Sequence, residues 1–185
     1  MSKKILVITG SPRKNGNSFA MTNAFIEKTT SKGHEVIRFD AAEKDVAGCK
    51  DCEQCFKNDK ACAFDDAFNE IAPQIEVADA IVFTMPLYWF SFPAQLKAVI
   101  DKFHSFSVAK RMGKKDISNK ESGLIVCCED NDVTVTDGLV KSYESMIDYL
   151  NWKSVGTVLV TNVWHIGDIY KTDGIAKAVE LADEF

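Results

Sequence analysis

The chain has 185 residues, of which 46% are hydrophobic and 26% charged, and its 22 basic against 27 acidic residues give a formal net charge of −5. This composition supports a packed core and excludes wholesale disorder. The acidic balance argues against nucleic acid as the main partner, because phosphate contacts require a basic surface. No apolar run reaches the roughly 18 residues of a membrane-spanning helix, so we expect no membrane partner and a cytoplasmic protein with one domain, residues 1–185.

Short apolar runs rich in branched residues predict five β-strands, at Ile5–Thr9, Glu35–Phe39, Ala80–Met85, Leu124–Cys128 and Val155–Val163. These runs lack polar–apolar alternation, which is typical of strands that are buried on both faces. Helical spacing occurs between them, around Phe19–Ile26, Phe68–Ala78, Leu96–Phe103, Leu139–Leu150 and Ile175–Ala182. Strands that alternate with helices predict an α/β fold, a three-layer α/β/α sandwich around a parallel sheet.

The connection between the second and third predicted strands differs from the others. Residues 41–66 are polar and rich in cysteine, and they predict an inserted loop. The helical segment that follows contains Pro73, which cannot donate a helical hydrogen bond and clashes with the preceding turn. We therefore expect a kinked helix here, or a short turn followed by a helix that begins at Pro73.

The loop after the first strand, Thr9–Ser18, predicts a phosphate-binding site. Ligands of open parallel sheets bind beyond the carboxyl ends of the strands, and a helix that starts there offers free N–H groups and a positive dipole end. Gly10 and Gly16 allow the backbone to approach a phosphate closely, and Arg13 adds a bidentate cation. The glycine spacing matches neither the Walker A nor the Rossmann fingerprint, which leaves a compact site for one terminal phosphate. An ordinary polar turn capped by Asn17 is the alternative.

The loop after the third strand, Met85–Pro93, is unusually aromatic. A flat heteroaromatic ligand would account for Tyr88 and Trp89 as stacking or edge contacts. Packing in the core or at a subunit interface would also account for them, and it is the favoured explanation for Phe90 and Phe92.

These two loops resemble those of the NADPH-dependent FMN reductase family of flavodoxin-like proteins. The matching segments are Gly10–Arg13, Gly16–Ser18, Pro86–Ala94 and Leu96–Lys97 with Asp101, and the resemblance extends to Gly167–Ile169. It implies a five-stranded parallel sheet of order 2-1-3-4-5 and non-covalently bound FMN. The residues that it implies for the phosphate are Ser11, Arg13, Asn15, Asn17 and Ser18. Those that it implies for the isoalloxazine ring are Pro86, Leu87, Tyr88, Trp89, Phe90 and Ser91, with Cys128 and Glu129 from the loop Cys128–Asn131 on the other side.

The inserted loop carries Cys49, Cys52, Cys55 and Cys62. Thiolates at this spacing can converge on an iron–sulfur cluster or on zinc. The first three match the opening of the bacterial ferredoxin run, whereas the fourth comes later than in that run. The resemblance to the iron–sulfur flavoproteins of the family implies a [4Fe-4S] cluster near the flavin, but other similar proteins are simple reductases without one. Three interpretations stay open: a [4Fe-4S] cluster, a metal-free loop beside the substrate, and zinc or a redox disulfide.

Other sequence features predict no chemistry. His34, His104 and His165 lie far apart and form no metal-binding spacing, so we expect them at the surface or in the core. The basic stretch from Lys110 to Lys120 predicts a solvated connection. Neighbouring strand residues point to opposite faces, so Cys127 is expected to be a small buried residue beside Cys128.

The favoured function is that of an FMN-dependent oxidoreductase, in which NAD(P)H reduces the flavin and the flavin reduces a quinone, a flavin or a similar small acceptor. The cofactor carries this chemistry, so we assign no catalytic residue. One alternative is an iron–sulfur flavoprotein that relays electrons from ferredoxin through FMN and a [4Fe-4S] cluster, and another is a flavin-free interaction module. The family resemblance also implies a homodimer or homotetramer.

Overall fold

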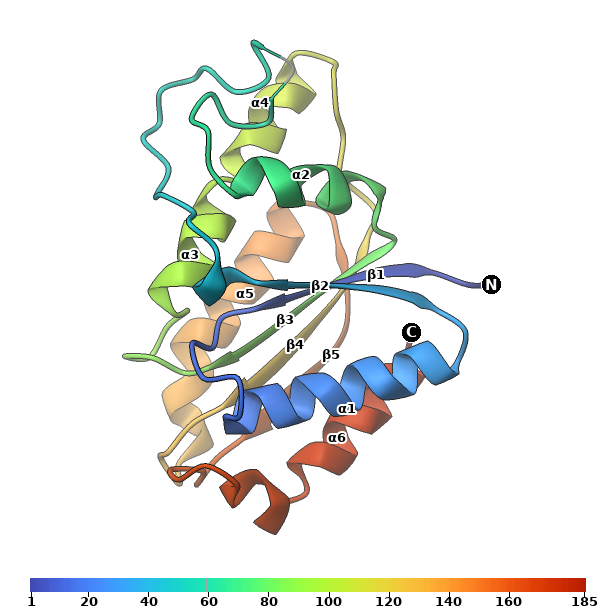
Figure 1. Cartoon of the computed structure of the whole chain (residues 1–185), viewed down its shortest axis with the longest axis vertical. Helices are drawn as coiled ribbons and strands as arrows, with labels where there is room; N and C mark the ends of the chain where they lie inside the picture. The colour runs from blue at the N-terminus through green and yellow to red at the C-terminus, as the bar shows by residue number, and fades with distance from the viewer. Residues whose placement is uncertain (59) are drawn as a thin grey trace.

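A five-stranded parallel sheet forms the centre of the computed structural model, which describes residues 1–58 and 60–185 (Figure 1). In chain order the strands are β1 (Lys4–Thr9), β2 (Glu35–Asp40), β3 (Ala80–Pro86), β4 (Glu121–Cys127) and β5 (Lys153–Val160). Their spatial order is β2-β1-β3-β4-β5, and every neighbouring pair is parallel, which confirms the expected order 2-1-3-4-5. The fifth strand ends at Val160, three residues before the predicted end at Val163, because the chain there turns into a loop.

Helices cover both faces of the sheet, which confirms the three-layer sandwich (Figure 1). They are α1 (Asn17–Ser31), α2 (Phe68–Val77), α3 (Ala94–Asp101), α4 (His104–Arg111), α5 (Asp137–Tyr149) and α6 (Gly174–Asp183). Helices α1 and α6 pack side by side on one face, and α2, α3 and α5 cover the other. Among the described residues, no helix combines the length and the apolar character needed to cross a bilayer.

Each face of the sheet has its own aromatic packing. On the α1–α6 face, the rings of Phe25 and Phe185 meet edge-on with centroids 5.6 Å apart. On the other face, Phe83 of β3 contacts Phe103 and Tyr143 with centroids 6.4 and 6.2 Å away. Burial of one such side chain contributes about 1.5–3 kcal/mol, so the two layers are held mainly by apolar packing.

Helix α2 runs without interruption through Pro73. The alternative of a helix that begins at Pro73 is therefore wrong. Phe68, Ile71 and Ile75 are buried along one side of α2. Their burial, at about 1.5–3 kcal/mol each, outweighs the cost of about 3 kcal/mol for an internal proline.

Helix α4 was not predicted from the sequence. Lys110 and Arg111 are exposed as expected, but they form the last turn of this helix, so the expectation of a connection is wrong there. Phe106 explains the helix, since its ring is 2% exposed and packs against other rings of the core. At the other end of the basic stretch, Lys120 is buried and donates hydrogen bonds to the carbonyl oxygens of Glu76 and Ala78, 3.0 and 2.5 Å away.

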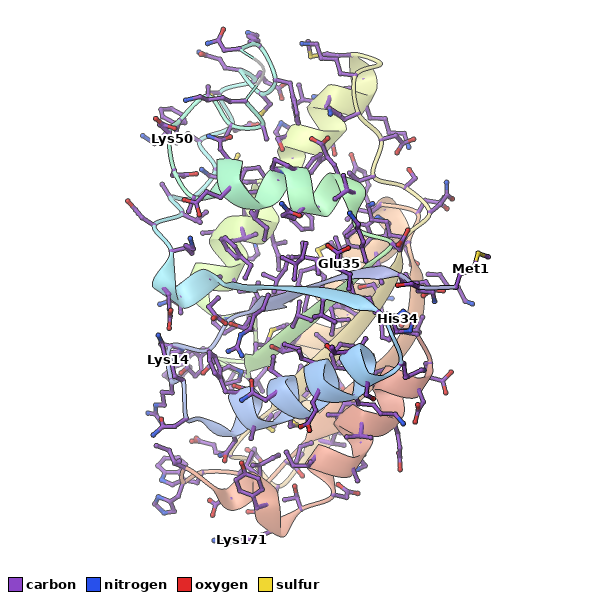
Figure 2. The ribbon with its side chains drawn as sticks, turned by 45° about the vertical axis from the view of Figure 1, so that its right-hand side comes forward. Met1, Lys14, His34, Glu35, Lys50 and Lys171 are labelled. Carbon is purple, nitrogen blue, oxygen red and sulfur yellow. The ribbon has the colours of Figure 1, made fainter. Side chains whose placement is uncertain are left out.

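The inserted segment 41–66 leaves the sheet after β2 and runs beside α2 and α4 (Figure 1). It starts with one 3₁₀ turn, Ala41–Glu43, and includes residue 59, which lies outside the described residues. In Figure 2, Lys14 of the first loop and Lys50 of the insertion lie on the side of the molecule away from Met1 and His34. The carboxyl ends of the strands and the cysteine-rich segment thus lie on the same side.

Candidate functional site

A cleft of about 620 Å³ lies at the carboxyl edge of the sheet, between the loops that follow β1, β3, β4 and β5. This volume is typical of sites for small molecules and cofactors. Of the cleft contacts predicted from the sequence, all line it except Asn15 and Ser91. The structure therefore brings together side chains from four separate loops.

The β1–α1 loop folds tightly around its own backbone at one end of the cleft. The hydroxyl of Ser11 accepts a hydrogen bond from the N–H of Arg13 at 3.2 Å, and the N–H of Gly16 donates to the Arg13 carbonyl at 3.0 Å. A Cβ on Gly16 would lie only 3.0 Å from that carbonyl oxygen, so a side chain here would crowd the turn. The result is a backbone cradle with open space on the cleft side.

The amino end of α1 opens into this cradle. Asn17 begins the helix, Gly16 provides no side-chain cap, and the first turn holds no acidic residue. The free N–H groups of a first turn carry the positive end of the helix dipole, which favours an anion. Ser18 lines the cleft in this turn, and the exposed Arg13 adds a cation beside it.

The side chain of Asn17 is already used within the protein. Its Oδ1 accepts hydrogen bonds from the N–H groups of Gly167 and Ile169 at 3.0 and 3.3 Å, and its Nδ2 donates to the His165 carbonyl at 3.0 Å. Asn17 thus ties the first loop to the loop after β5, and it offers a ligand only its main-chain N–H. Asn15 is exposed and is not among the residues that line the cleft, so its role in phosphate binding stays a prediction.

The β3–α3 loop forms a two-residue hairpin at the edge of the cleft. Tyr88 and Ser91 exchange main-chain hydrogen bonds of 3.2 and 3.0 Å, and the residues between them, Trp89 and Phe90, have φ angles of 46° and 62°. Turns of this type favour Asn-Gly, and a non-glycine residue in the left-handed region costs on the order of 1–3 kcal/mol. The fold therefore holds a strained aromatic turn beside the cleft.

The exposure of the aromatic residues shows which of them pack in the core and which are available to a ligand. Phe92 is 8% exposed and belongs to the core, as favoured from the sequence. Phe90 is 58% exposed and lines the cleft, so core packing does not explain it. Trp89 is 92% exposed and Tyr88 39%, so both rings face the cleft or solvent.

The loops after β4 and β5 are joined by main-chain hydrogen bonds and form the far wall. Cys128 donates to the Val160 carbonyl at 2.9 Å and accepts from the Val163 N–H at 3.0 Å. Glu129 and Asp130 are exposed here, so this wall is acidic where the α1 end is basic. An anionic group is therefore favoured at the α1 end of the cleft.

Sequence reasoning missed several lining residues, among them Val135, Val163, Trp164 and Ile166. They belong to no motif, and the one signal available was that three of them follow β5 at the ligand-bearing edge. Asp168 holds the β5 loop by accepting hydrogen bonds from the N–H groups of Trp164 and His165, at 3.2 and 2.6 Å. The Lys171 ammonium, with help from these N–H groups, lowers the pKa of Asp168 from 3.8 to about 2.

The two cysteines of the cleft are neutral thiols. Burial raises the pKa of Cys127 to about 12. Burial, with the nearby Asp130 and Glu129 carboxylates, also raises the pKa of Cys128. Because the thiolate is the reactive form, neither residue is suited to nucleophilic chemistry.

The four cysteines of the insertion line a second, smaller cavity, together with residues around the start of α4. Left-handed residues at Asp51, Glu53 and Phe56, with φ of 49°, 53° and 53°, wind the chain between the cysteines. Burial raises the pKa of the Cys55 thiol, and the thiols of Cys62, Cys49 and Cys52 raise it further. Segments up to thirteen residues apart therefore direct their sulfur atoms to one place.

Zinc and an iron–sulfur cluster place different demands on the spacing of their sulfur ligands. Among the described residues, the group whose ligand atoms all lie within 4.8 Å of one another is Asp51, Glu53 and His104, and no three cysteines meet this limit. A tetrahedral zinc site with Zn–S bonds of about 2.3 Å needs sulfur atoms roughly 3.8 Å apart. An iron–sulfur cluster binds its thiolates at separate iron atoms, and the four thiols of this cavity are soft ligands of the kind that either centre takes. All six cysteines are free thiols.

His104 lies at the mouth of this second cavity. Its Nε2 is 2.9 Å from Glu53 Oε1 and 3.5 Å from Asp51 Oδ1. The His104 side chain is 30% exposed, in line with the expected surface position, and the fold places it beside two carboxylates and the four-cysteine cavity.

Hydrogen bonds fix Cys62 and the end of the insertion. The side chain of Asn69 accepts from the N–H of Cys62 at 2.8 Å and donates to its carbonyl at 3.2 Å. The Asp66 carboxylate accepts from the N–H groups of Ala47 and Phe68 at 3.1 and 3.0 Å. These hydrogen bonds thus hold the end of the insertion that lines the cavity in place.

Comparison with known proteins agrees with this architecture. An iron-sulfur flavoprotein of Methanosarcina thermophila is 31% identical over 166 residues, which cover 90% of this chain and 81% of that protein. An FMN-dependent NADH:quinone oxidoreductase of Cellvibrio japonicus is 36% identical over 98 residues, about half of each chain (47% and 48%). Among solved structures, an NAD(P)H:quinone oxidoreductase from Methanothermobacter marburgensis superposes with a TM-score of 0.74 at 16% identity, covering 98% of this chain and 95% of that one. The family described as having a flavodoxin-like fold matches residues 3–184, and the chain belongs to this family.

Proposed function

We propose that the chain is an FMN-dependent oxidoreductase that takes electrons from NAD(P)H and passes them to a quinone, a flavin or a similar small acceptor. The observation that carries this proposal is the cleft, which has an uncapped helix amino end at one side and an aromatic hairpin at the other. The match to an FMN-dependent NADH:quinone oxidoreductase supports the same assignment.

The α1 end of the cleft fits the phosphate of FMN. A side chain at Gly16 would crowd the cradle, the first turn of α1 presents free N–H groups, and Arg13 provides a cation. These are the donors that bind a phosphate at a helix amino end. Ser11 and Ser18 complete the proposed phosphate site, with their side chains 4% and 3% exposed.

The rest of the cleft fits a flat ring system. Tyr88, Trp89 and Phe90 supply aromatic surface, and the N–H and carbonyl groups of the hairpin supply polar atoms for the edge of a ring. The β4 loop with Cys128 and Glu129 would face the ring from the other side. When bound, FMN supplies the exchange of hydride with NAD(P)H and of electrons with the acceptor, while these side chains bind and orient it.

Titration of the protein with FMN tests this function. We expect quenching of flavin fluorescence at one FMN per chain, followed by loss of NAD(P)H absorbance when a quinone is added. Protein that neither quenches FMN fluorescence nor retains flavin absorbance after gel filtration would refute the assignment. Flavin binding without NAD(P)H oxidation would restrict the function to electron transfer.

A second candidate function is supported by the four-cysteine cavity. We propose that Cys49, Cys52, Cys55 and Cys62 bind a [4Fe-4S] cluster, so that the chain relays single electrons, with ferredoxin as the proposed donor. The cavity that all four thiols line carries this proposal, and the match to the iron-sulfur flavoprotein of Methanosarcina thermophila supports it. The cytoplasm is the proposed compartment, since six free thiols suit a reducing environment.

Anaerobic purification with iron and sulfide analysis separates the two functions. About four iron and four sulfide per chain, lost when Cys55 is replaced by Ala, would support the relay. Metal-free protein that oxidises NADPH rapidly would support the reductase alone. The oligomeric state, proposed to be a homodimer or homotetramer, is measured on the same sample by light scattering.

A further inference from the structure

Lys102 is a buried cation next to the four-cysteine cavity. Its side chain is 3% exposed, and its Nζ lies 3.5 Å from the Sγ of Cys62 and forms an ion pair with Asp66. Lysine is almost never fully buried unless it is paired. Asp66 provides that pairing, but an ammonium group has three donors, and one of the others is directed at a cysteine sulfur.

Ser105 is an independent sign that something binds in this cavity. It lines the same cavity from the first turn of α4, and it is 2% exposed. Its Oγ is buried without a hydrogen-bond partner among the described residues. A buried hydroxyl in a folded protein is normally bonded, so an unpaired one at a cavity wall indicates a missing acceptor.

Sulfur atoms of a thiolate-bound centre are acceptors of the right kind. Hydrogen bonds and positive charge near such sulfur atoms are among the factors that set the potential of an iron–sulfur cluster. We propose that Lys102 and Ser105 are positioning residues that donate hydrogen bonds to the sulfur atoms of the four-cysteine centre and raise its reduction potential, while Asp66 opposes Lys102. This inference rests on the proposed [4Fe-4S] cluster.

The sign of each effect follows from charge. Reduction adds one electron and no proton, so the centre gains one negative charge. A buried ammonium favours that reduced state, and a buried carboxylate disfavours it, because both act through a medium of low dielectric constant. Removal of Lys102 must therefore lower the potential, and removal of the Asp66 charge must raise it. A residue that merely stabilised the fold would not produce opposite shifts.

An anaerobic redox titration tests the assignment, with dithionite as reductant and the electron paramagnetic resonance signal of the reduced cluster as readout. For Lys102→Met we expect at least a tenfold fall in the ratio of reduced to oxidised cluster at a fixed potential, equivalent to about 59 mV for one electron. Ser105→Ala should shift the ratio in the same direction by less, Asp66→Asn should shift it in the opposite direction, and Lys102→Arg should stay close to the wild type. Lys97→Met and Asp101→Asn are matched controls, since they form an exposed ion pair on α3 and should change nothing.

Iron content decides which proposal fails. Wild-type protein that takes up no iron overturns the cluster and this assignment with it. Iron-loaded Lys102→Met and Asp66→Asn variants whose potentials match the controls, or move in the same direction, overturn the assignment alone. If Lys102→Met folds without binding iron, the Asp66→Asn and Ser105→Ala variants test the inference instead. Unchanged reduction potentials of the cluster in both of these variants would refute it.

Discussion

The replacement Arg13→Met tests the phosphate end of the cleft. Arg13 is exposed and lines the cleft beside the free amino end of α1, so its removal should leave the fold intact. A hydrogen bond to a charged group contributes about 1.5–3 kcal/mol, and each 1.4 kcal/mol changes an affinity tenfold. We therefore expect the Kd for FMN to rise by roughly 10- to 150-fold.

Riboflavin provides the control ligand, because it carries the same ring without the phosphate. Fluorescence titration should show that Arg13→Met weakens FMN and leaves riboflavin affinity unchanged. The neighbouring Lys14 provides the control variant, since it is exposed, pairs with Glu43 at 2.8 Å and lies outside the cleft lining. Lys14→Met should change FMN affinity by no more than about twofold, because an exposed, screened charge contributes little. Equal losses for FMN and riboflavin, or for both variants, would refute the assignment of a phosphate site.

Three further outcomes follow from single residues. Trp89→Asn should raise the midpoint of thermal unfolding by about 2–4 °C, because asparagine accepts the left-handed φ of 46° and the exposed Trp89 ring loses little burial. An unchanged or lower midpoint in calorimetry would contradict the strained turn. The folded-state pKa of Asp168 is lowered from 3.8 to about 2, so its contribution to stability is present above about pH 4 and is lost as the pH falls toward 2. The difference in thermal midpoint between wild type and Asp168→Asn should therefore shrink over that interval, and a constant difference would exclude this role. In metal-free protein, iodoacetamide at pH 8 should modify the exposed Cys49 and spare Cys127, because burial raises the pKa of Cys127 to about 12. Equal labelling of the two cysteines in peptide mass spectrometry would show that Cys127 is accessible as thiolate.

Much of the fold was predictable because apolar runs and helical spacing report burial directly. The central strands β1, β3 and β4 are buried along nearly their whole length, and their sequences lack alternation for that reason. Helix α4 was not predicted for two reasons. Its basic last turn interrupts the apolar pattern of buried positions such as Phe106, and only two residues separate it from α3. The continuous course of α2 through Pro73 could not be predicted either, because it depends on packing of the whole helix face.

The candidate site also has a part that the sequence predicted and a part that it did not. The cradle around Arg13 and Gly16 follows from a local motif, so the sequence alone predicted it. The lining residues Trp164 and Ile166 come from a distant loop without a motif, and only the topology of the sheet brings them to the cleft. The hydrogen bonds of Asn17 to the β5 loop join segments 150 residues apart, which no local pattern can reveal.

The absorption spectrum of protein purified anaerobically with added FMN tests the central claim, that this chain binds FMN in the cleft at the carboxyl edge of its sheet. We predict flavin bands that stay with the protein through gel filtration and that weaken in Arg13→Met as its affinity for FMN falls. A broad iron–sulfur absorption beneath those bands would also support the proposed [4Fe-4S] cluster. Colourless protein that leaves all of the FMN in the small-molecule fraction would contradict the account.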